Sequence, residues 1–160
     1  VFDYLTATLT DLASISERRF ARMVDASLSG LPRFLVDDAG LNSGFMMVQV
    51  SAAALVSEMK TLSHPASVDS IPTSAGQEDH VSMSTWAARK LARVVDLGRR
   101  VLGMEYLAAT QALEFHRPLR TSDDLEGVVS RLRERVPRYE DDRFMADDMD
   151  AAADLVYELT

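Results

Sequence analysis

The sequence predicts an all-α protein, a bundle of long helices, and three stretches with helical spacing carry that prediction. Apolar residues recur three or four positions apart in residues 1–28, as one face of a helix requires. Residues 43–62 are almost all apolar or small, and residues 80–115 carry an apolar stripe that fits one helix of about ten turns. Neither a convincing strand nor an internal repeat is present. We therefore expect a single helical domain over residues 1–160.

The first helix is expected to end at Gly30 and Pro32, because glycine suits a left-handed cap and proline cannot continue a helix. The residues expected to form its buried face are Phe2, Leu5, Leu9, Leu12, Ile15 or Ser16, Phe20 and Met23. The chain starts inside this stripe and does not begin with methionine. We therefore expect it to be a piece of a longer protein.

The second helix is expected to follow a cap at Asn42 or Ser43 and to end at Leu62. Its residues are almost all apolar or small, and the alanines at 52–54 let neighbouring helices approach closely. These features predict a helix that is buried all round, at the centre of the bundle.

Two shorter helices are expected after the long one, which Pro118 ends. The first follows a cap at Thr121 or Ser122, with acids in its first turn and arginines near its end, as the helix dipole favours. The second covers about residues 147–159.

The composition limits the function. The hydrophobic content of 47% suits a folded domain, and the net charge of −8 with a pI near 4.8 argues against nucleic acid and anionic membrane surfaces as partners. No apolar run approaches the roughly 20 residues of a membrane span, so we expect no membrane partner. The chain has no cysteine, which excludes disulfides and thiolate metal sites and suits a cytoplasmic protein.

A loop over residues 64–79 separates the second and third helices and contains Pro65, Pro72 and Gly76. Loops of this length inside compact domains are commonly functional or disordered. This loop leads into Gln77, Glu78, Asp79 and His80, which place three ionisable groups side by side. It is therefore the candidate functional segment.

The two acids of this segment have different explanations. Both precede the expected start of the long helix, where free backbone amides and the positive end of the dipole stabilise negative charge. Asp79 is explained as an ordinary N-cap. Glu78 needs a separate reason, and if the loop were buried between helices its desolvated carboxylate could serve as a base or a cation anchor.

Other chemistries are less well supported. A metal could draw on His64, Glu78, Asp79, His80 and His116, because imidazole and carboxylate are ordinary ligands. No two histidines stand four positions apart, so we expect no metal and interpret each histidine as a capping or hydrogen-bonding group. No Gly-x-Ser-x-Gly elbow is present, which argues against serine catalysis.

Five stretches carry a family resemblance. They are SISERR (14–19), LSGLPRFLV (28–36), LNSGFM (41–46), VSAAALVSEMKTLSHPASVDSIPTSAGQEDHVSM (50–83) and PLRTS (118–122). Together they resemble the C-terminal part of the histidine ammonia-lyases, within the aromatic amino acid lyase family. The resemblance implies the C-terminal helical portion of that fold, a cytoplasmic homotetramer with a central helical bundle, and active sites shared between subunits.

The resemblance also implies an activity and a prosthetic group. Members eliminate ammonia from L-histidine to give urocanate, the first step of histidine degradation, by means of a 4-methylideneimidazol-5-one (MIO) electrophile made from Ala-Ser-Gly. That tripeptide does not occur here, so the group is expected to belong to a missing N-terminal part. We therefore expect the 160 residues alone to be inactive.

By the same resemblance the catalytic role falls on Glu78, which would lie beside the prosthetic group and hold the imidazole or amino group of the substrate. Gln77, Asp79 and His80 match the motif as substrate-binding or loop-ordering neighbours. Gly76 stands where histidine ammonia-lyases usually have asparagine, a departure that concerns the conformation of the loop.

Two alternatives stay open. The chain could come from a tyrosine ammonia-lyase or tyrosine aminomutase, although those relatives tend to carry glutamine at the position of Glu78. It could also be a helical oligomerisation module without chemistry of its own. In either case we expect the apolar faces of residues 1–27 and 43–62 to promote association of the isolated chain.

Overall fold

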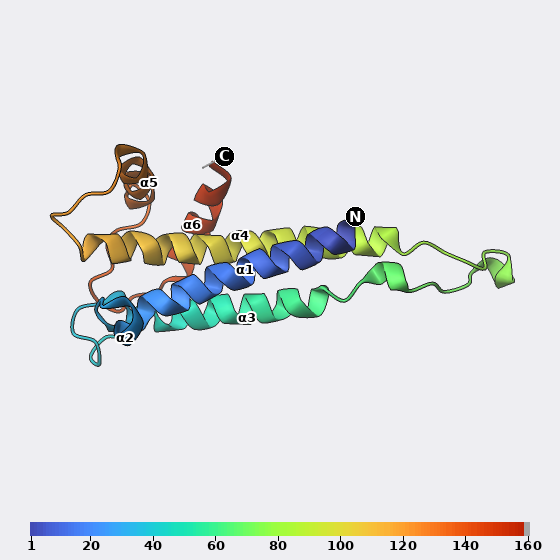
Figure 1. The fold of residues 1–160 in the computed structure, drawn as a ribbon, viewed down its shortest axis with the longest axis horizontal. Coiled ribbons are helices and arrows are strands. Elements are labelled where there is room, and N and C mark those ends of the chain that lie inside the picture. Colours follow the sequence, from blue (N-terminus) through green and yellow to red (C-terminus); the bar gives the residue numbers. More distant parts are fainter. Residues whose placement is uncertain (159–160) are drawn as a thin grey trace.

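The computed structural model describes residues 1–158, and within that range every named element is a helix and no strand occurs (Figure 1). The α-helices are α1 (Phe2–Val24), α2 (Ala26–Ser29), α3 (Met46–Leu62), α4 (Ser84–Glu114), α5 (Asp123–Arg133) and α6 (Ala146–Glu158). Three single 3₁₀ turns are η1 (Arg33–Leu35), η2 (Ala66–Val68) and η3 (Ser74–Gly76). The predicted all-α bundle is confirmed. No helix of residues 1–158 is long and apolar enough to cross a membrane.

Helix α4 occupies the centre of the bundle, where α1, α3 and α6 all pack against it (Figure 1). The prediction that placed residues 43–62 there is wrong for this chain. Helix α3 packs only one face on α1 and α4, so Met47 and Val50 on its other face are 59% and 49% exposed. These exposed apolar residues therefore indicate a surface that this chain leaves uncovered.

The buried face of α1 is built mainly from small and polar residues. The buried residues of α1 are Thr6, Thr10, Ala13, Ser16, Glu17, Phe20 and Val24. On α4 the buried positions 87, 90, 94, 97, 101 and 104 alternate spacings of three and four, the pattern of a coiled-coil seam. Leu5, Leu12 and Ile15, which the sequence analysis assigned to the buried face, are between 44% and 57% exposed. Small side chains on the seam let the two helices approach closely.

Three helix boundaries differ from prediction. Helix α3 begins at Met46 with Phe45 as its N-cap, so neither Asn42 nor Ser43 caps it. The first helical segment breaks at Asp25, whose extended backbone ends α1 and whose carboxylate accepts the Ser27 N–H at 2.9 Å to cap α2. Gly30 then ends α2 in the left-handed conformation, as expected. The long helix begins at Ser84 instead of His80, and its N-cap is Met83. Asp79 therefore does not cap it.

The C-terminal helices agree with prediction. Ser122 caps α5 by accepting the Leu125 N–H at 3.4 Å, and the first turn of α5 is acidic and its last turn basic. Helix α6 covers residues 146–158; the remainder of the expected last helix, Leu159, lies outside the described residues.

Buried hydrogen bonds close the end of the bundle formed by the C-terminal part of α4. Gln111 is fully buried, and its amide N–H groups donate to the carbonyls of Leu35, at 3.2 Å, and Tyr139, at 2.8 Å. Its side-chain oxygen accepts the Tyr139 N–H at 3.1 Å. One glutamine therefore satisfies backbone groups of two loops that cross α4.

Asp142 joins the C-terminal segment to the turn before α3. Its carboxylate accepts the N–H groups of Ser43 and Gly44, at 2.9 and 3.0 Å, and the Tyr139 hydroxyl at 2.5 Å. The Tyr139 hydroxyl and these two amides lower the pKa of Asp142 from 3.8 to about 2. Burial, and then the neighbouring carboxylate, raise the pKa of Tyr139 to about 12.

Helix α6 contacts α4 at Gly103, where a Cβ atom would lie 2.6 Å from the Ala153 nitrogen and 3.0 Å from the Ala152 carbonyl carbon. Gly98 on the same helix has room, because its Cβ would meet only the Met59 methyl at 3.5 Å. Of these two glycines of α4, Gly103 is therefore the one that a close backbone approach requires.

Substituting these two glycines should have opposite effects. We expect Gly103→Ala to lower the free energy of unfolding by about 1–3 kcal/mol, because backbone atoms of α6 must move away. Gly98→Ala should raise it by roughly 0.5–1 kcal/mol through helix propensity. Urea unfolding of both variants measures the difference, and an equally stable Gly103→Ala variant would contradict the close approach of α4 and α6.

Asp142 should make the free energy of unfolding depend on pH in the acidic range. Because its pKa is lowered from 3.8 to about 2, its contribution is complete above pH 3.8 and is lost as the pH falls towards 2. We expect Asp142→Asn to be less stable than the parent at pH 7 and to lose less of its stability between pH 4 and pH 2. Urea midpoints at these pH values test this, with Asp141→Asn as the control that keeps the parent profile.

Candidate functional site

The candidate site lies on a projecting segment between α3 and α4, residues 64–83, here called the arm. Figure 1 shows the arm extending away from the bundle beyond the ends of α1 and α3. Residues 71–80 are all exposed. The burial between helices that would desolvate Glu78 is therefore not provided by this chain.

The arm has internal order. Near its tip Thr73 and Glu78 exchange backbone hydrogen bonds, with N···O distances of 3.0 and 3.3 Å. Closer to the bundle the Val81 N–H donates to the Ser70 hydroxyl at 2.9 Å. These contacts connect the outgoing limb, residues 64–73, to the returning limb, residues 78–83. The arm is a narrow hairpin-like projection with a defined tip.

The turn at the tip explains the glycine there. Ser74, Ala75 and Gly76 all have positive φ, at 54°, 55° and 87°. A left-handed backbone conformation causes no steric strain in glycine, and it causes less strain in asparagine than in most other residues. Gly76 therefore satisfies a backbone requirement that asparagine could also meet.

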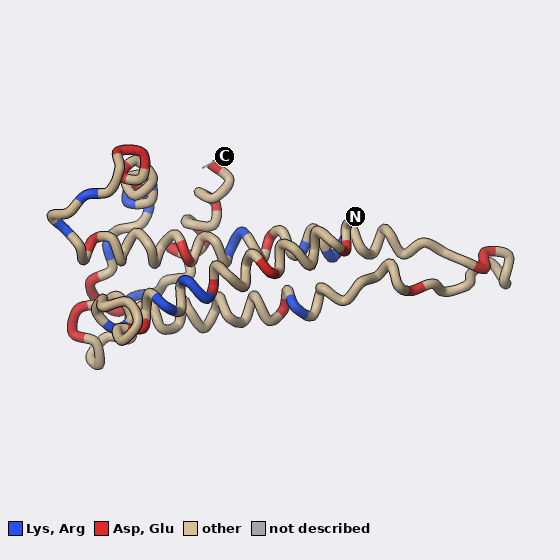
Figure 2. The backbone as a smooth tube through the Cα atoms, in the orientation of Figure 1, with Lys and Arg blue, Asp and Glu red and all other residues tan. Residues whose placement is uncertain are grey.

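The structure places the four predicted site residues, 77–80, consecutively at the tip and on the returning limb, all exposed. None of their side chains has a hydrogen bond or an ion pair with residues 1–158. Figure 2 shows acidic segments at the tip and no basic segment along the arm. The carboxylates of Glu78 and Asp79 are therefore available to a cationic or proton-carrying group from outside the chain.

The three histidines do not form a cluster. His64 starts the arm and His80 lies on its returning limb, whereas His116 follows the far end of α4. Within residues 1–158 no group of three His, Asp or Glu side chains is arranged to hold a metal ion.

Two residues at the base of the arm were missed by sequence reasoning. Lys90 is only 6% exposed, and its ammonium donates to the His64 carbonyl and lies 3.4 Å from an Asp3 carboxylate oxygen. The Ser67 N–H donates to the other Asp3 oxygen at 2.9 Å. This hydrogen bond, with a smaller effect of Lys90, lowers the pKa of Asp3 to about 2. Lys90 stands at the spacing of Ala87 and Val94, which was the available signal that it faces inward.

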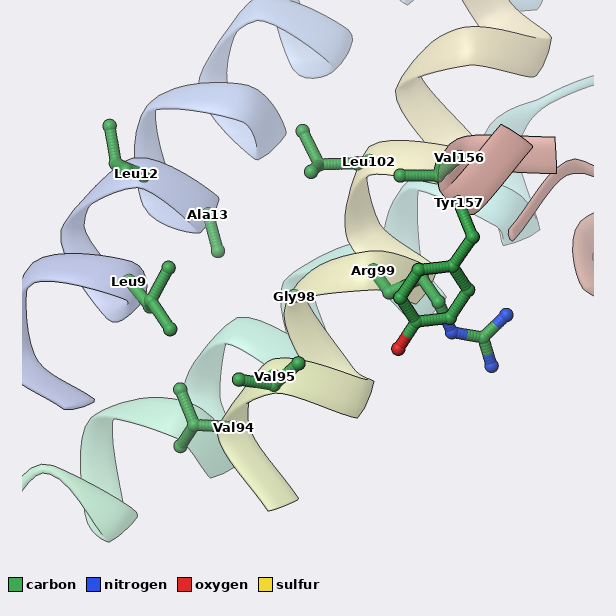
Figure 3. A pocket seen from close by; sticks show the side chains of 10 residues that line it. All are labelled: Leu9, Leu12, Ala13, Val94, Val95, Gly98, Arg99, Leu102, Val156 and Tyr157. Atoms are coloured by element: carbon green, nitrogen blue, oxygen red, sulfur yellow. The ribbon is translucent and has the colours of Figure 1, made fainter. Parts of the chain in front are cut away.

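A separate apolar groove of about 220 Å³ runs between α1, α4 and α6 (Figure 3). Its polar side chains are Arg99 and Tyr157, with the guanidinium carbon 5.3 Å from the ring centroid. Arg99 also pairs with Asp96 and Asp154. No residue of the arm lines this groove. Its other lining residues are apolar or glycine, so the groove mainly offers packing surface.

The positive φ of Gly76 predicts which substitutions this position tolerates. We expect Gly76→Asn to keep the tip, whereas Gly76→Val should strain it by roughly 1–2 kcal/mol because a branched side chain at positive φ is unfavourable. Amide hydrogen exchange of Gln77 and Glu78 should then be about tenfold faster in the valine variant only. Equal exchange rates in the two variants would exclude a strained turn.

Known relatives match this chain in sequence and in structure. The chain is 54% identical over 156 residues to the histidine ammonia-lyase of Rhodospirillum rubrum, which covers 98% of this chain and 30% of that protein. It is 55% identical over 150 residues to the Vibrio cholerae histidine ammonia-lyase, covering 94% and 29%. The chain thus spans about 30% of the length of these relatives.

Solved structures give the same result. The crystal structure of histidine ammonia-lyase from Trypanosoma cruzi superposes with a TM-score of 0.95 at 47% identity, covering 98% of this chain and 31% of that one. Tyrosine aminomutase from Streptomyces globisporus gives 0.93 at 39% identity, covering 98% and 30%. The family model of the aromatic amino acid lyases matches residues 1–134. The chain belongs to the aromatic amino acid lyase family.

Proposed function

We propose that this chain is the C-terminal helical part of an enzyme that eliminates ammonia from L-histidine to give urocanate. The observation that carries this proposal is the arm, which presents Glu78 at an ordered tip away from the bundle. The relatives with more than 50% identity that are named histidine ammonia-lyases support the choice of substrate.

In this proposal Glu78 is the catalytic carboxylate. It has no cationic partner among residues 1–158, and the arm itself carries no lysine or arginine. A carboxylate can accept a hydrogen bond from the substrate imidazole or stabilise its ammonium group. Gln77, Asp79 and His80 would order the tip or contact the same substrate.

The proposed reaction also needs the MIO group, an electrophile that would take up electrons during loss of the amino group. Its Ala-Ser-Gly precursor is absent from these 160 residues, so another part of the protein would supply it. The exposed, unpaired carboxylate of Glu78 fits a place beside such a group. The role of this chain is then to bring one acid to a site that is completed elsewhere.

Uncovered apolar surface supports the proposed homotetramer. Leu5, Leu12 and Ile15 on α1 and Met47 and Val50 on α3 are all at least 44% exposed. Surfaces of this kind mark contacts with other protein. An assembly role and a catalytic role are compatible, because the bundle and the arm are different parts of the chain.

We also propose that the enzyme works in the cytoplasm.

The decisive experiment replaces Glu78 in the full-length enzyme. We expect Glu78→Gln to lower kcat for urocanate formation by a factor on the order of 100 or more while the tetramer persists, because the neutral amide cannot act as a carboxylate. Asp69→Asn, which changes another acid of the arm, should keep nearly the parent rate. Urocanate absorbance and size-exclusion chromatography are the measurements.

Parallel assays define the substrate and the need for the rest of the protein. L-Tyrosine should not be turned over, and the 160 residues alone should form no urocanate. Turnover of tyrosine in place of histidine would move the assignment to the tyrosine lyases or aminomutases. Full activity of Glu78→Gln would leave an assembly role as the better explanation of this chain.

A further inference from the structure

The tip of the arm has no support from the bundle. Residues 71–80 are exposed, and the arm continues beyond the ends of α1 and α3 in Figure 1. Within residues 1–158 the position of Glu78 therefore depends on how the base of the arm is held and on how its two limbs are connected.

The base is held by an ion pair between α1 and α4. The Lys90 ammonium contacts an Asp3 carboxylate oxygen at 3.4 Å and donates to the His64 carbonyl. The other Asp3 oxygen accepts the Ser67 N–H at 2.9 Å. These four residues, Asp3, His64, Ser67 and Lys90, are here called the root anchor. They join the start of α1, the base of the arm and the first turns of α4.

Stability alone does not explain a charged residue at position 90. Removing two charges from water costs free energy that their attraction often only just repays, so apolar replacement of both commonly leaves stability unchanged or improved. A methionine would suit the buried stripe that contains Ala87 and Val94. The ion pair instead fixes the orientation of the base of the arm, because each of the two charged groups binds one backbone group of the arm.

The position set at the base reaches the tip through two further contacts. The Val81 N–H bonds to the Ser70 hydroxyl at 2.9 Å, midway along the arm. Thr73 and Glu78 exchange backbone hydrogen bonds near the tip. Each contact connects the limb that begins at the root anchor to the limb that carries Glu78.

We propose that Asp3 and Lys90 are positioning residues, which fix the arm through the root anchor so that Glu78 reaches the substrate. The inference rests on the proposed function, in which Glu78 contacts that substrate. Asp3 and Lys90 themselves do not touch it and act only through the arm.

The test removes the ion pair without leaving a charge buried. In the full-length enzyme Asp3→Leu combined with Lys90→Met should keep Tm within a few degrees of the parent, since no unpaired charge remains. We expect kcat to fall by about tenfold to 100-fold because Glu78 is misplaced, with KM within about twofold. Amide exchange of Ser67, Val81 and Glu78 should become faster.

A second ion pair, between α3 and α4, is the matched control. Arg93 of α4 and Glu58 of α3 form an exposed ion pair at 2.9 Å that does not touch the arm. Arg93→Met combined with Glu58→Gln should therefore leave kcat and arm exchange unchanged. Parent kcat or parent arm exchange in the Asp3/Lys90 double variant would overturn the proposal, as would an equal loss in the control.

Two more variants keep the test decisive. If the double variant does not fold, Asp3→Asn should still lower kcat several-fold and speed exchange at Ser67, and Asp3→Glu should restore both; failure of either would overturn the anchor. A parent enzyme that forms no urocanate, or a fully active Glu78→Gln variant, would overturn the proposed function instead. Arm exchange in the double variant then decides whether the anchor holds the arm.

Discussion

The close packing of α1 on α4 is the constraint on which the rest of this structure depends. Threonines, serine and alanine on α1 face a stripe on α4 whose buried residues alternate spacings of three and four. Because these side chains are small, the helices approach closely, and one hydroxyl binds across the seam: Ser16 donates to the Glu105 carboxylate of α4 at 2.5 Å. The third long helix, α3, packs against both.

The packing of these helices determines which loop segments are attached at each end of the bundle. At one end Gln111 and Asp142 bond to loop backbone and hold the C-terminal segment against the turn before α3. At the other end Asp3 and Lys90 meet where the start of α1 lies beside α4, and they bind the base of the arm. Rigid long helices thus support a projecting segment whose tip carries the candidate catalytic acid.

Sequence reasoning identified the helices and the long loop because both signals are local. Apolar spacing over many turns, proline at 118 and a serine cap at 122 are properties of adjacent residues, as are the prolines and the glycine that mark the loop. The inward face of each long helix was predicted less well. Leucines such as Leu5 and Leu12 were assigned to the interior and are exposed. Apolar spacing marks a face of a helix, but it does not determine which other element packs against that face.

The sequence by itself determined the helix content, the place of the long loop and the run of ionisable residues 77–80. Only the tertiary structure decided that α4 is central, that Asp79 is no helix cap, and that Glu78 stands exposed at the end of an arm. It alone brought Asp3 to Lys90 across 87 positions of sequence. The reason is physical: helix formation follows from neighbours along the chain, whereas the partner of a buried charge is fixed by which helices pack together.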